Sequence, residues 1–137
     1  MRTTLAELRL PATPLFSGDP YSEDDAERLA AVLAAIADPA RLQILSLIDS
    51  SNFSEVPVKD LTDQMKLSQP TVSHHLRILH QAGLLQRDKC SVWVYYSITP
   101  GAMKAVLELL APRKRARRAA PPTPPPAAST EPSAPAA

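Results

Sequence analysis

One stretch of the chain, LSQPTVSHHLRILHQAGLL over residues 67–85, carries helix start and stop signals at its two ends. Ser68 is a favourable N-cap residue, and Pro70 falls in the first turn, where a missing backbone N–H costs nothing. Gly83 stands where a left-handed residue commonly ends a helix. We therefore predict a helix that runs from about Gln69 to Ala82.

The apolar residues of this predicted helix recur every three or four positions, which indicates that one side is buried. They are Val72, Leu76, Ile78, Leu79 and Ala82. The opposite side carries Gln69, Ser73 and Arg77 in one row, with His74 beside the row and Thr71 at its edge. A helix-turn-helix presents such short hydrogen-bonding side chains and arginines to base edges and phosphates. We predict that this side contacts DNA.

A second, shorter helix is predicted just before this one. Its apolar residues Val58, Leu61 and Met65 share one side, while Lys59, Asp60 and Asp63 point outward. Residues 66–68 form a tight turn into the next helix. Two short helices joined by a three-residue turn make a helix-turn-helix.

Two longer helices are predicted upstream. The first opens at Ser22 and Asp25, and its apolar residues follow the helical period as far as Asp38. They are Ala26, Leu29, Ala30, Leu33, Ile36 and Ala37. Asp38 and Pro39 are suited to be the N-cap and first residue of the next helix, over residues 39–49. That helix is apolar nearly all round, so we expect it to be the most buried.

The segments that flank these helices carry loop signals. Prolines and a glycine interrupt residues 1–21, which we predict to be a mobile N-terminal arm. Residues 50–57 are predicted to be a loop whose only anchor is Phe53.

Beyond Gly83 the pattern changes from the helical period to strict alternation. Residues 92–98 alternate apolar and polar or aromatic side chains, which predicts a strand. Residues 84–87 are its predicted antiparallel partner. Residues 88–91 are predicted to be the exposed connection between the two strands. A hairpin directly after a recognition helix is a wing. Arg87 and Lys89 place positive charge at its tip, where a phosphate or a minor groove is met.

The aromatic side chains of this hairpin, Trp93 and Tyr95 among them, have two interpretations: hairpin core or a platform for base stacking. We favour the hairpin core, because Trp93 and Tyr95 share a face with only one neighbouring strand.

A last helix is predicted to begin at Thr99 and Pro100, with an apolar stripe that has no obvious partner inside the domain. The stripe consists of Met103, Val106, Leu107 and Leu110. Residues 112–137, a basic run from Arg113 to Arg118 followed by a Pro/Ala-rich tail, bury too little apolar surface to fold and are predicted to be disordered. The basic run is either a solvated tail or a source of non-specific DNA affinity.

The predicted fold class is therefore mainly α with a small β-hairpin (α+β), a winged helix-turn-helix over residues 22–111. The chain has 137 residues, a hydrophobic fraction of 45% and an aromatic fraction of 4%, so the core should be modest and helical. Association with a partner would add buried surface.

Charge is distributed unevenly along a chain whose net charge is only +1. Residues 1–112 carry ten Lys or Arg against thirteen Asp or Glu, unlike the basic body of a non-specific nucleic-acid binder. Between Lys59 and Lys89, however, five basic residues outnumber three acidic ones. A local patch of this kind is sufficient for a small sequence-specific module.

The cysteine count and the absence of targeting signals bear on the compartment. Cys90 is the only cysteine, which excludes an intramolecular disulfide and favours a reducing compartment. The sequence has no signal peptide pattern and no long apolar span, so we expect a cytoplasmic protein without membrane contact.

Three segments in this order, DPARLQILSLI, LSQPTVSHHLRILHQAGLL and VWVYYSI, resemble the ArsR/SmtB family of bacterial winged-helix repressors. The resemblance spans about residues 22–111. It implies a homodimer that binds operator DNA and leaves it when a metal ion, metalloid or other signal binds. It also implies a dimer interface built from two helices, from Ser22 to Ala37 and from Pro100 to Ala111, and DNA contacts at Gln69, Thr71, Ser73 and His74.

The chain departs from the family at its familiar metal sites. Arsenic sensors of the family carry a Cys-x-Cys pair in the first helix of the helix-turn-helix, but residues 58–67 contain no cysteine. Zinc sensors place Asp and His ligands along the last helix, where this chain offers only Glu108. We therefore predict no metal site and no cofactor.

Neither the histidines nor the cysteine restores a metal site. His74, His75 and His80 are separated by one, five and six positions, whereas two ligands meet on a helix only three or four positions apart. Cys90 has no resolving cysteine, so we interpret it as an idle thiol in preference to a sensor.

The residues give no support to an enzyme, since no Gly-rich phosphate loop and no nucleophile with a nearby base is present. The sequence predicts a dimeric, sequence-specific DNA-binding regulator, a repressor released from its operator by an unidentified signal. Two alternatives stay open: a winged helix used for protein or RNA contact, and a repressor without a ligand.

Overall fold

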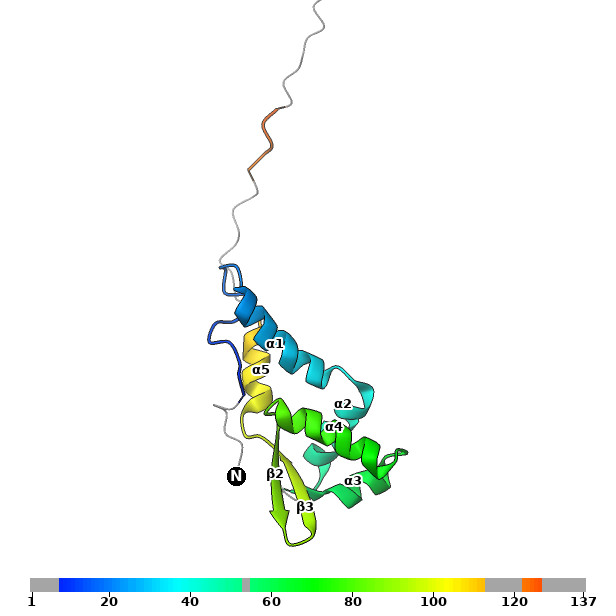
Figure 1. Ribbon diagram of the computed structural model, residues 1–137. Coiled ribbons are helices and arrows are strands. Elements are labelled where there is room, and N and C mark those ends of the chain that lie inside the picture. Colours follow the sequence, from blue (N-terminus) through cyan, green and yellow to red (C-terminus); the bar gives the residue numbers. More distant parts are fainter. Residues whose placement is uncertain (1–7, 53–54, 113–121, 127–137) are drawn as a thin grey trace, which may run out of the picture.

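The computed structural model describes residues 8–52, 55–112 and 122–126, so Phe53 and the basic run from Arg113 to Arg118 lie outside the described residues. The described part contains five helices and one three-stranded antiparallel sheet (Figure 1). In chain order these are α1 Glu23–Ile36, α2 Pro39–Ser50, β1 Val56–Pro57, α3 Val58–Gln64, α4 Gln69–Gln81, β2 Leu85–Cys90, β3 Trp93–Ile98 and α5 Ala102–Leu110. The predicted class, mainly α with a small β element in a winged helix-turn-helix, is confirmed.

The two upstream helices begin where their capping residues predict. The Ser22 hydroxyl accepts from the backbone N–H of Asp25, at 3.1 Å. The Asp38 carboxylate accepts from the backbone N–H groups of Ala40 and Arg41, at 2.9 and 3.2 Å. These bonds satisfy donors that the first turn of a helix leaves without a partner.

The same contacts affect the ionisation of Asp38. The backbone N–H of Arg41 holds the pKa of the Asp38 carboxyl below its ordinary value, and the Arg41 charge acts in the same direction. A carboxylate with a lowered pKa stabilises the folded state above its unfolded pKa and loses this contribution as the pH falls through the folded value. The cap is therefore intact at neutral pH and is lost only in acid, as the Asp38 carboxyl takes up a proton.

The buried side of α1 differs from the predicted one. Leu29 is buried as predicted, but Val32 and Ala35 complete the inward side, while Ala26 and Ala30 are exposed. The reason is that α1 is apolar around most of its circumference, so its period alone does not define which side meets the core. One apolar side of α1 therefore remains on the surface.

The helix α2 also differs from expectation. Ile44, Leu45 and Ile48 are buried, but Leu42 is 52% exposed. The apolar circumference of α2 led us to expect the most buried helix, and this expectation fails at Leu42, which lies on a side of α2 that faces solvent.

The sheet has one strand more than predicted. Residues 50–57 were expected to form a loop, but Val56 and Pro57 pair with Tyr96 and Tyr95, which gives the strand order β1-β3-β2. Two residues are too few to produce an alternating pattern, so the sequence did not indicate this strand. Its pairing covers the outer edge of β3.

The hairpin is longer and its turn tighter than predicted. β2 continues to Cys90, which pairs with Trp93, so residues 88–90 belong to the strand and not to a connection. Val92, predicted to lie in the strand, is in the turn and is 84% exposed. Ser91 adopts a positive φ of 57°, which matches the left-handed backbone that two-residue hairpin turns favour.

The central helix α4 ends as predicted. Gly83 has φ of 82°, and the N–H groups of Gly83 and Leu84 donate to the carbonyls of His80 and Leu79, at 3.0 Å each. This is the Schellman arrangement. The Gly83 carbonyl in turn accepts from the buried Thr99 hydroxyl at 2.7 Å, which joins the end of α4 to the end of the wing.

Part of the predicted N-terminal arm packs on the domain. Leu8 is only 4% exposed and belongs to the hydrophobic core, and the N–H of Leu15 donates to the carbonyl of Leu109 in α5 at 2.9 Å. Leu8 occupies the space that Gly83 leaves open, since a Cβ on Gly83 would lie 2.9 Å from the Leu8 Cδ1. The prediction of an arm free of the domain does not hold for residues 8–15.

The last helix starts later than Thr99 and Pro100, because Gly101, with φ of 76°, is the N-cap of α5. Val106 and Leu109 are buried, so Val106 does have a partner inside the domain, contrary to expectation. Leu107 is 64% exposed and remains unpaired within the described part of the chain.

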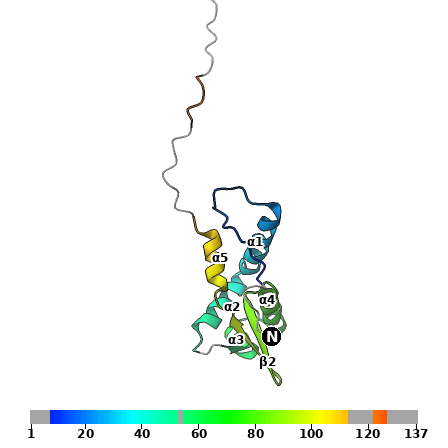
Figure 2. The same ribbon diagram turned by 90° about the vertical axis from the view of Figure 1, so that its left-hand side faces the viewer.

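Two views show how these elements are arranged. α1 and α5 lie at one end of the domain, and the tip of the β2–β3 hairpin lies at the opposite end (Figures 1 and 2). α4 crosses the middle. Among the described residues no single helix is long and apolar enough to cross a membrane; α1 and α2 meet that criterion only as a pair bent by 76°.

We predict that Leu8→Ala lowers the free energy of unfolding by about 2 to 4 kcal/mol, because it leaves a cavity against Gly83. The neighbouring Arg9 is exposed, so Arg9→Ala should change this free energy by less than about 0.5 kcal/mol. Urea unfolding followed by circular dichroism measures both. Equal stability of the two variants would show that Leu8 is not part of the core.

Candidate nucleic-acid interface

The predicted row on α4 faces solvent. Val72, Leu76 and Leu79 are fully buried on one side of the helix. Gln69, Thr71, His74 and Arg77 are exposed and Ser73 is half-buried on the other. The Ser68 hydroxyl accepts from the Thr71 backbone N–H at 3.4 Å and lies 2.8 Å from the Thr71 hydroxyl, so the helix starts directly at this surface.

A groove of about 700 Å³ runs between α4 and the wing, and we call it the α4–wing groove. Gln69, Ser73 and Arg77 line one wall. Arg87 of β2 and Trp93 of β3 line the other. The structure therefore brings four of the seven predicted contact residues to one surface.

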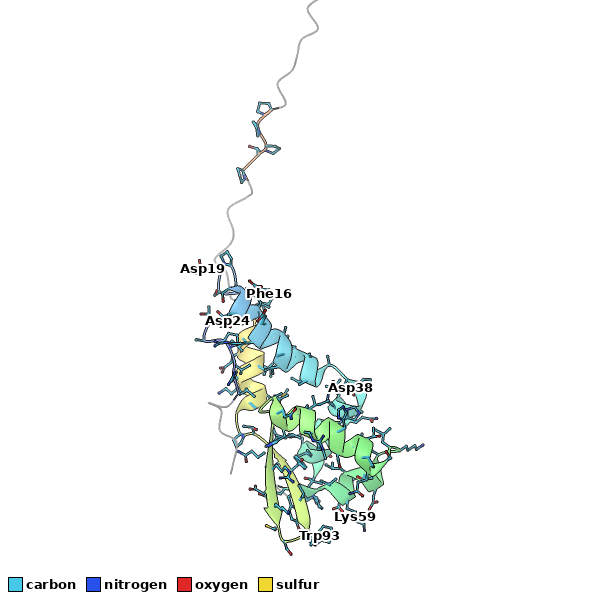
Figure 3. All side chains as sticks on the ribbon, viewed as in Figure 1. Phe16, Asp19, Asp24, Asp38, Lys59 and Trp93 are labelled. Carbon is cyan, nitrogen blue, oxygen red and sulfur yellow. The ribbon has the colours of Figure 1, made fainter. Side chains whose placement is uncertain are left out.

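Lys59 at the start of α3 also lines the groove, and it lies at the same end of the molecule as Trp93 (Figure 3). The charged residues that line the groove are Lys59, Arg77 and Arg87, all basic, although residues 1–112 carry more acidic than basic residues. Three cations from three elements converge with the hydrogen-bonding groups of Gln69 and Ser73. This combination suits a polyanion whose edges also carry donors and acceptors.

The other predicted contact residues lie outside the groove. Thr71 and His74 are exposed elsewhere on α4, and Lys89 is exposed on β2 opposite Val94. Arg87 pairs with Tyr96, in the middle of the hairpin and not at its tip as predicted. The reason is that β2 extends to Cys90, so three further strand residues separate Arg87 from the turn at Ser91 and Val92.

Sequence reasoning missed Lys59 and Trp93. Lys59 was interpreted only as the outward side of a short helix, because nothing local indicates that α3 begins beside the wing. Trp93 was predicted to be in the hairpin core, but it is 47% exposed and lines the groove, while Tyr96 fills the core instead. The alternation gave no signal for this position, because it placed the turn at residues 88–91 and began the strand at Val92.

His75 and His80 have polar partners in the structure. His80 lines the groove, and its Nδ1 lies 3.0 Å from the Leu85 carbonyl, which only accepts, so Nδ1 carries a proton. Its ring meets Tyr96 edge-on, with 6.4 Å between the ring centroids. His75 is half-buried, and its Nδ1 lies 3.2 Å from Nη1 of Arg41.

Within the described ranges no group of three or more His, Cys, Asp or Glu side chains is placed to hold a metal ion. Cys90 is exposed at the end of β2 as a free thiol.

Comparison with known proteins supports the interpretation of this surface as part of a DNA-binding regulator. Residues 38–87, from the cap of α2 to Arg87, match the model of the family described as bacterial regulatory protein, arsR family. An uncharacterised HTH-type transcriptional regulator of Methanocaldococcus jannaschii is 36% identical over 84 residues, which cover 61% of this chain and 92% of that protein.

Two further relatives have more specific names. The transcriptional repressor SmtB homolog of Synechocystis sp. is 39% identical over 77 residues, or 56% of each chain, so the match spans about half of that relative. The transcriptional activator HlyU of Vibrio cholerae is 33% identical over 101 residues, which cover 71% of this chain and 91% of that protein. The solved structure of HlyU superimposes with a TM-score of 0.54 at 32% identity, over 64% of this chain and 92% of that one.

Proposed function

Because this chain belongs to the ArsR family of bacterial regulatory proteins, a family of DNA-binding transcriptional regulators and not of enzymes, we propose that it is a repressor that binds operator DNA as a dimer. A signal then releases it from the operator. Because a transcriptional regulator acts on DNA inside the cell, we assign the protein to the cytoplasm.

The α4–wing groove carries this proposal. Arg77 and Arg87 supply charge for phosphates from the two walls of the groove, and Gln69 and Ser73, on the same wall as Arg77, carry groups that pair with base edges. A helix that enters the major groove places its N-terminal residues on the bases while a wing meets the flanking backbone. The related repressor in Synechocystis supports the direction of regulation, from its name alone.

The test is a fluorescence anisotropy titration with a duplex that the full-length protein itself enriches from a random pool. We expect affinity for this duplex to exceed that for a scrambled duplex by about a thousandfold and to fall steeply with salt. Affinity that depends on neither sequence nor salt would contradict DNA recognition and favour a winged helix used for protein contact.

Dimerisation through α1 and α5 is the second part of the proposal. Ala26, Ala30 and Ala34 form an exposed apolar stripe on α1, and Leu107 is exposed on α5. Phe16, 49% exposed, lies at the same end of the domain (Figure 3). These residues lie far from the wing tip (Figures 1 and 2), so two copies joined there keep both α4–wing grooves free for DNA.

For the dimer, we predict that Leu107→Asp converts the protein to a monomer at micromolar concentration, because a carboxylate is costly in an apolar interface. Leu42→Asp is the matched control, since Leu42 is a comparably exposed leucine on α2. Sedimentation velocity measures both variants. A wild-type monomer, or a dimer that Leu107→Asp leaves unchanged, would exclude this interface.

For DNA contact, we predict that Gln69→Ala costs about 1 to 3 kcal/mol of binding free energy and relaxes the sequence preference. Lys89→Ala should weaken binding to all sequences alike and reduce the salt slope by about one unit, because it removes a phosphate contact. Lys104→Ala, on α5, is the control and should change neither the sequence preference nor the salt slope. Equal loss of specificity in the first two variants would refute this assignment of base and phosphate contacts.

For the signal, we predict that divalent metals and arsenite leave operator binding unchanged. Residues 58–67 contain no thiol, and residues 100–111 offer only Glu108 as a ligand. Anisotropy of the operator complex during metal, arsenite and oxidant titrations measures this, in the wild type and in Cys90→Ser. Release by stoichiometric zinc or arsenite in Cys90→Ser would contradict the prediction. Release that disappears in that variant would make Cys90 the sensor.

A further inference from the structure

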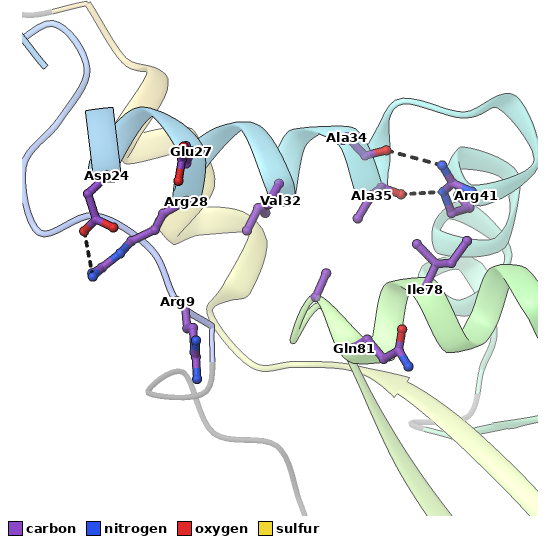
Figure 4. A pocket seen from close by; sticks show the side chains of 12 residues that line it. Arg9, Asp24, Glu27, Arg28, Val32, Ala34, Ala35, Arg41, Ile78 and Gln81 are labelled. Carbon is purple, nitrogen blue, oxygen red and sulfur yellow. Dashed lines mark hydrogen bonds and ion pairs between the residues drawn. The ribbon is translucent and has the colours of Figure 1, made fainter. Parts of the chain in front are cut away.

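One side chain connects three helices at a single junction. Arg41, in the first turn of α2, donates from Nε to the Ala35 carbonyl at 2.6 Å and from Nη2 to the Ala34 carbonyl at 3.3 Å (Figure 4). Its third nitrogen, Nη1, lies 3.2 Å from Nδ1 of His75 in the middle of α4. The end of α1, the start of α2 and α4 therefore meet at one guanidinium.

The contact with α1 adds hydrogen-bond donors at the C-terminal end of that helix. The last turn of α1 contains no basic residue, and the chain turns by 76° into α2 directly afterward. The last carbonyls of a helix lack intrahelical donors. Arg41 supplies donors to two of them from the following helix, and its positive charge favours the negative end of the α1 dipole.

The contact with α4 fixes the protonation state of His75. A guanidinium has only donors, so Nδ1 of His75 must accept and the ring proton must reside on Nε2. Adding a proton to Nδ1 removes the acceptor and places an imidazolium beside the guanidinium. Protonated His75 and the Arg41 contact are therefore mutually exclusive.

The charged groups around His75 oppose one another. Arg41 disfavours a charged imidazole, whereas the Asp38 carboxylate at the start of α2 favours it. His74, also on α4, is another titratable side chain close to His75, with 5.9 Å between the two ring centroids. The pKa of the Asp38 carboxyl lies below its ordinary value, so its charge is constant across the pH range in which imidazoles titrate.

Beside this junction, α1 and α4 leave a groove between them. A groove of about 690 Å³ lies between the two helices, with Val32 of α1 facing Ile78 and Gln81 of α4, and Arg41 at one end (Figure 4). Close packing does not fill this space. The polar junction at Arg41 thus joins the two helices at one end of this groove, in addition to the apolar packing of Val32 and Ala35 in the core.

We propose that Arg41 and His75 are positioning residues, which hold the recognition helix α4 at the setting relative to α1 that DNA binding requires. This inference rests on the proposed function, in which α1 joins two copies and α4 reads the operator. Neither residue needs to touch DNA. Protonation of His75 releases α4 from Arg41 and lowers operator affinity.

The test compares wild type with His75→Asn, because the Asn side-chain oxygen lies near the position of Nδ1 and accepts without titrating. Affinity for the enriched duplex should agree within about twofold at pH 8. At about pH 5.5 the wild type should bind about three- to tenfold more weakly than His75→Asn, the loss expected for one hydrogen bond. His74 is present in both proteins, so its effect cancels.

Arg41→Lys provides the matched background, since lysine keeps the charge but lacks the forked donors. In this background, the protein with His75 and the protein with His75→Asn should bind the enriched duplex with equal affinity at both pH values. Circular dichroism and sedimentation check that the variant folds and dimerises as the wild type does; if it does not, the His75→Asn comparison alone decides. Identical pH profiles for wild type and His75→Asn would overturn the inference.

Nitrogen-15 spectra of the imidazole rings give an independent reading without DNA. At pH 8 we expect His75 to carry its proton on Nε2 and His80 to carry a proton on Nδ1. A proton on Nδ1 of His75 would overturn the junction whatever the DNA result. Loss of sequence-selective binding by the wild type at pH 8 would instead overturn the proposed function, so the two failures are distinguishable.

Discussion

The apolar side of α4 is closed to solvent at Val72, Leu76 and Leu79, and the rest of the molecule is arranged around this burial. Each such side chain contributes about 1.5 to 3 kcal/mol when it is fully buried. The helix therefore cannot rotate about its axis without losing most of that stabilisation. Because side chains four residues apart share one face of a helix, the same constraint turns Gln69 and Arg77 outward. The candidate DNA surface is thus a consequence of the core.

A second constraint relates that surface to the wing. The Thr99 hydroxyl donates to the Gly83 carbonyl at 2.7 Å in a buried position, and Leu8 packs against the same glycine. The end of α4, the end of β3 and the N-terminal segment therefore meet at one point. This junction holds Arg77 and Arg87 on facing walls of the α4–wing groove. Both walls of the groove are anchored to this junction, and this brings the charged and the hydrogen-bonding side chains together.

The sequence was most informative where the deciding chemistry is local. Capping by Ser68 and the left-handed Gly83 involve residues within one helical turn, so the ends of α4 were predicted correctly. Contacts between residues that are distant in the chain were not predicted. Val56 becomes a strand only because Tyr96 lies beside it, and Leu8 is buried only because Gly83 has no side chain. Trp93 faces the groove because the hairpin turn comes later than alternation indicated.

The central claim is that two copies of α4 read two half-sites on one face of the DNA. Hydroxyl-radical footprinting of the complex with the enriched duplex tests it most directly. Two protected stretches should appear on each strand, with centres separated by about one helical turn, roughly 10 bp, or a multiple of it. Their positions should be related by a two-fold axis at the centre of the site. A single protected stretch without such symmetry would contradict the account.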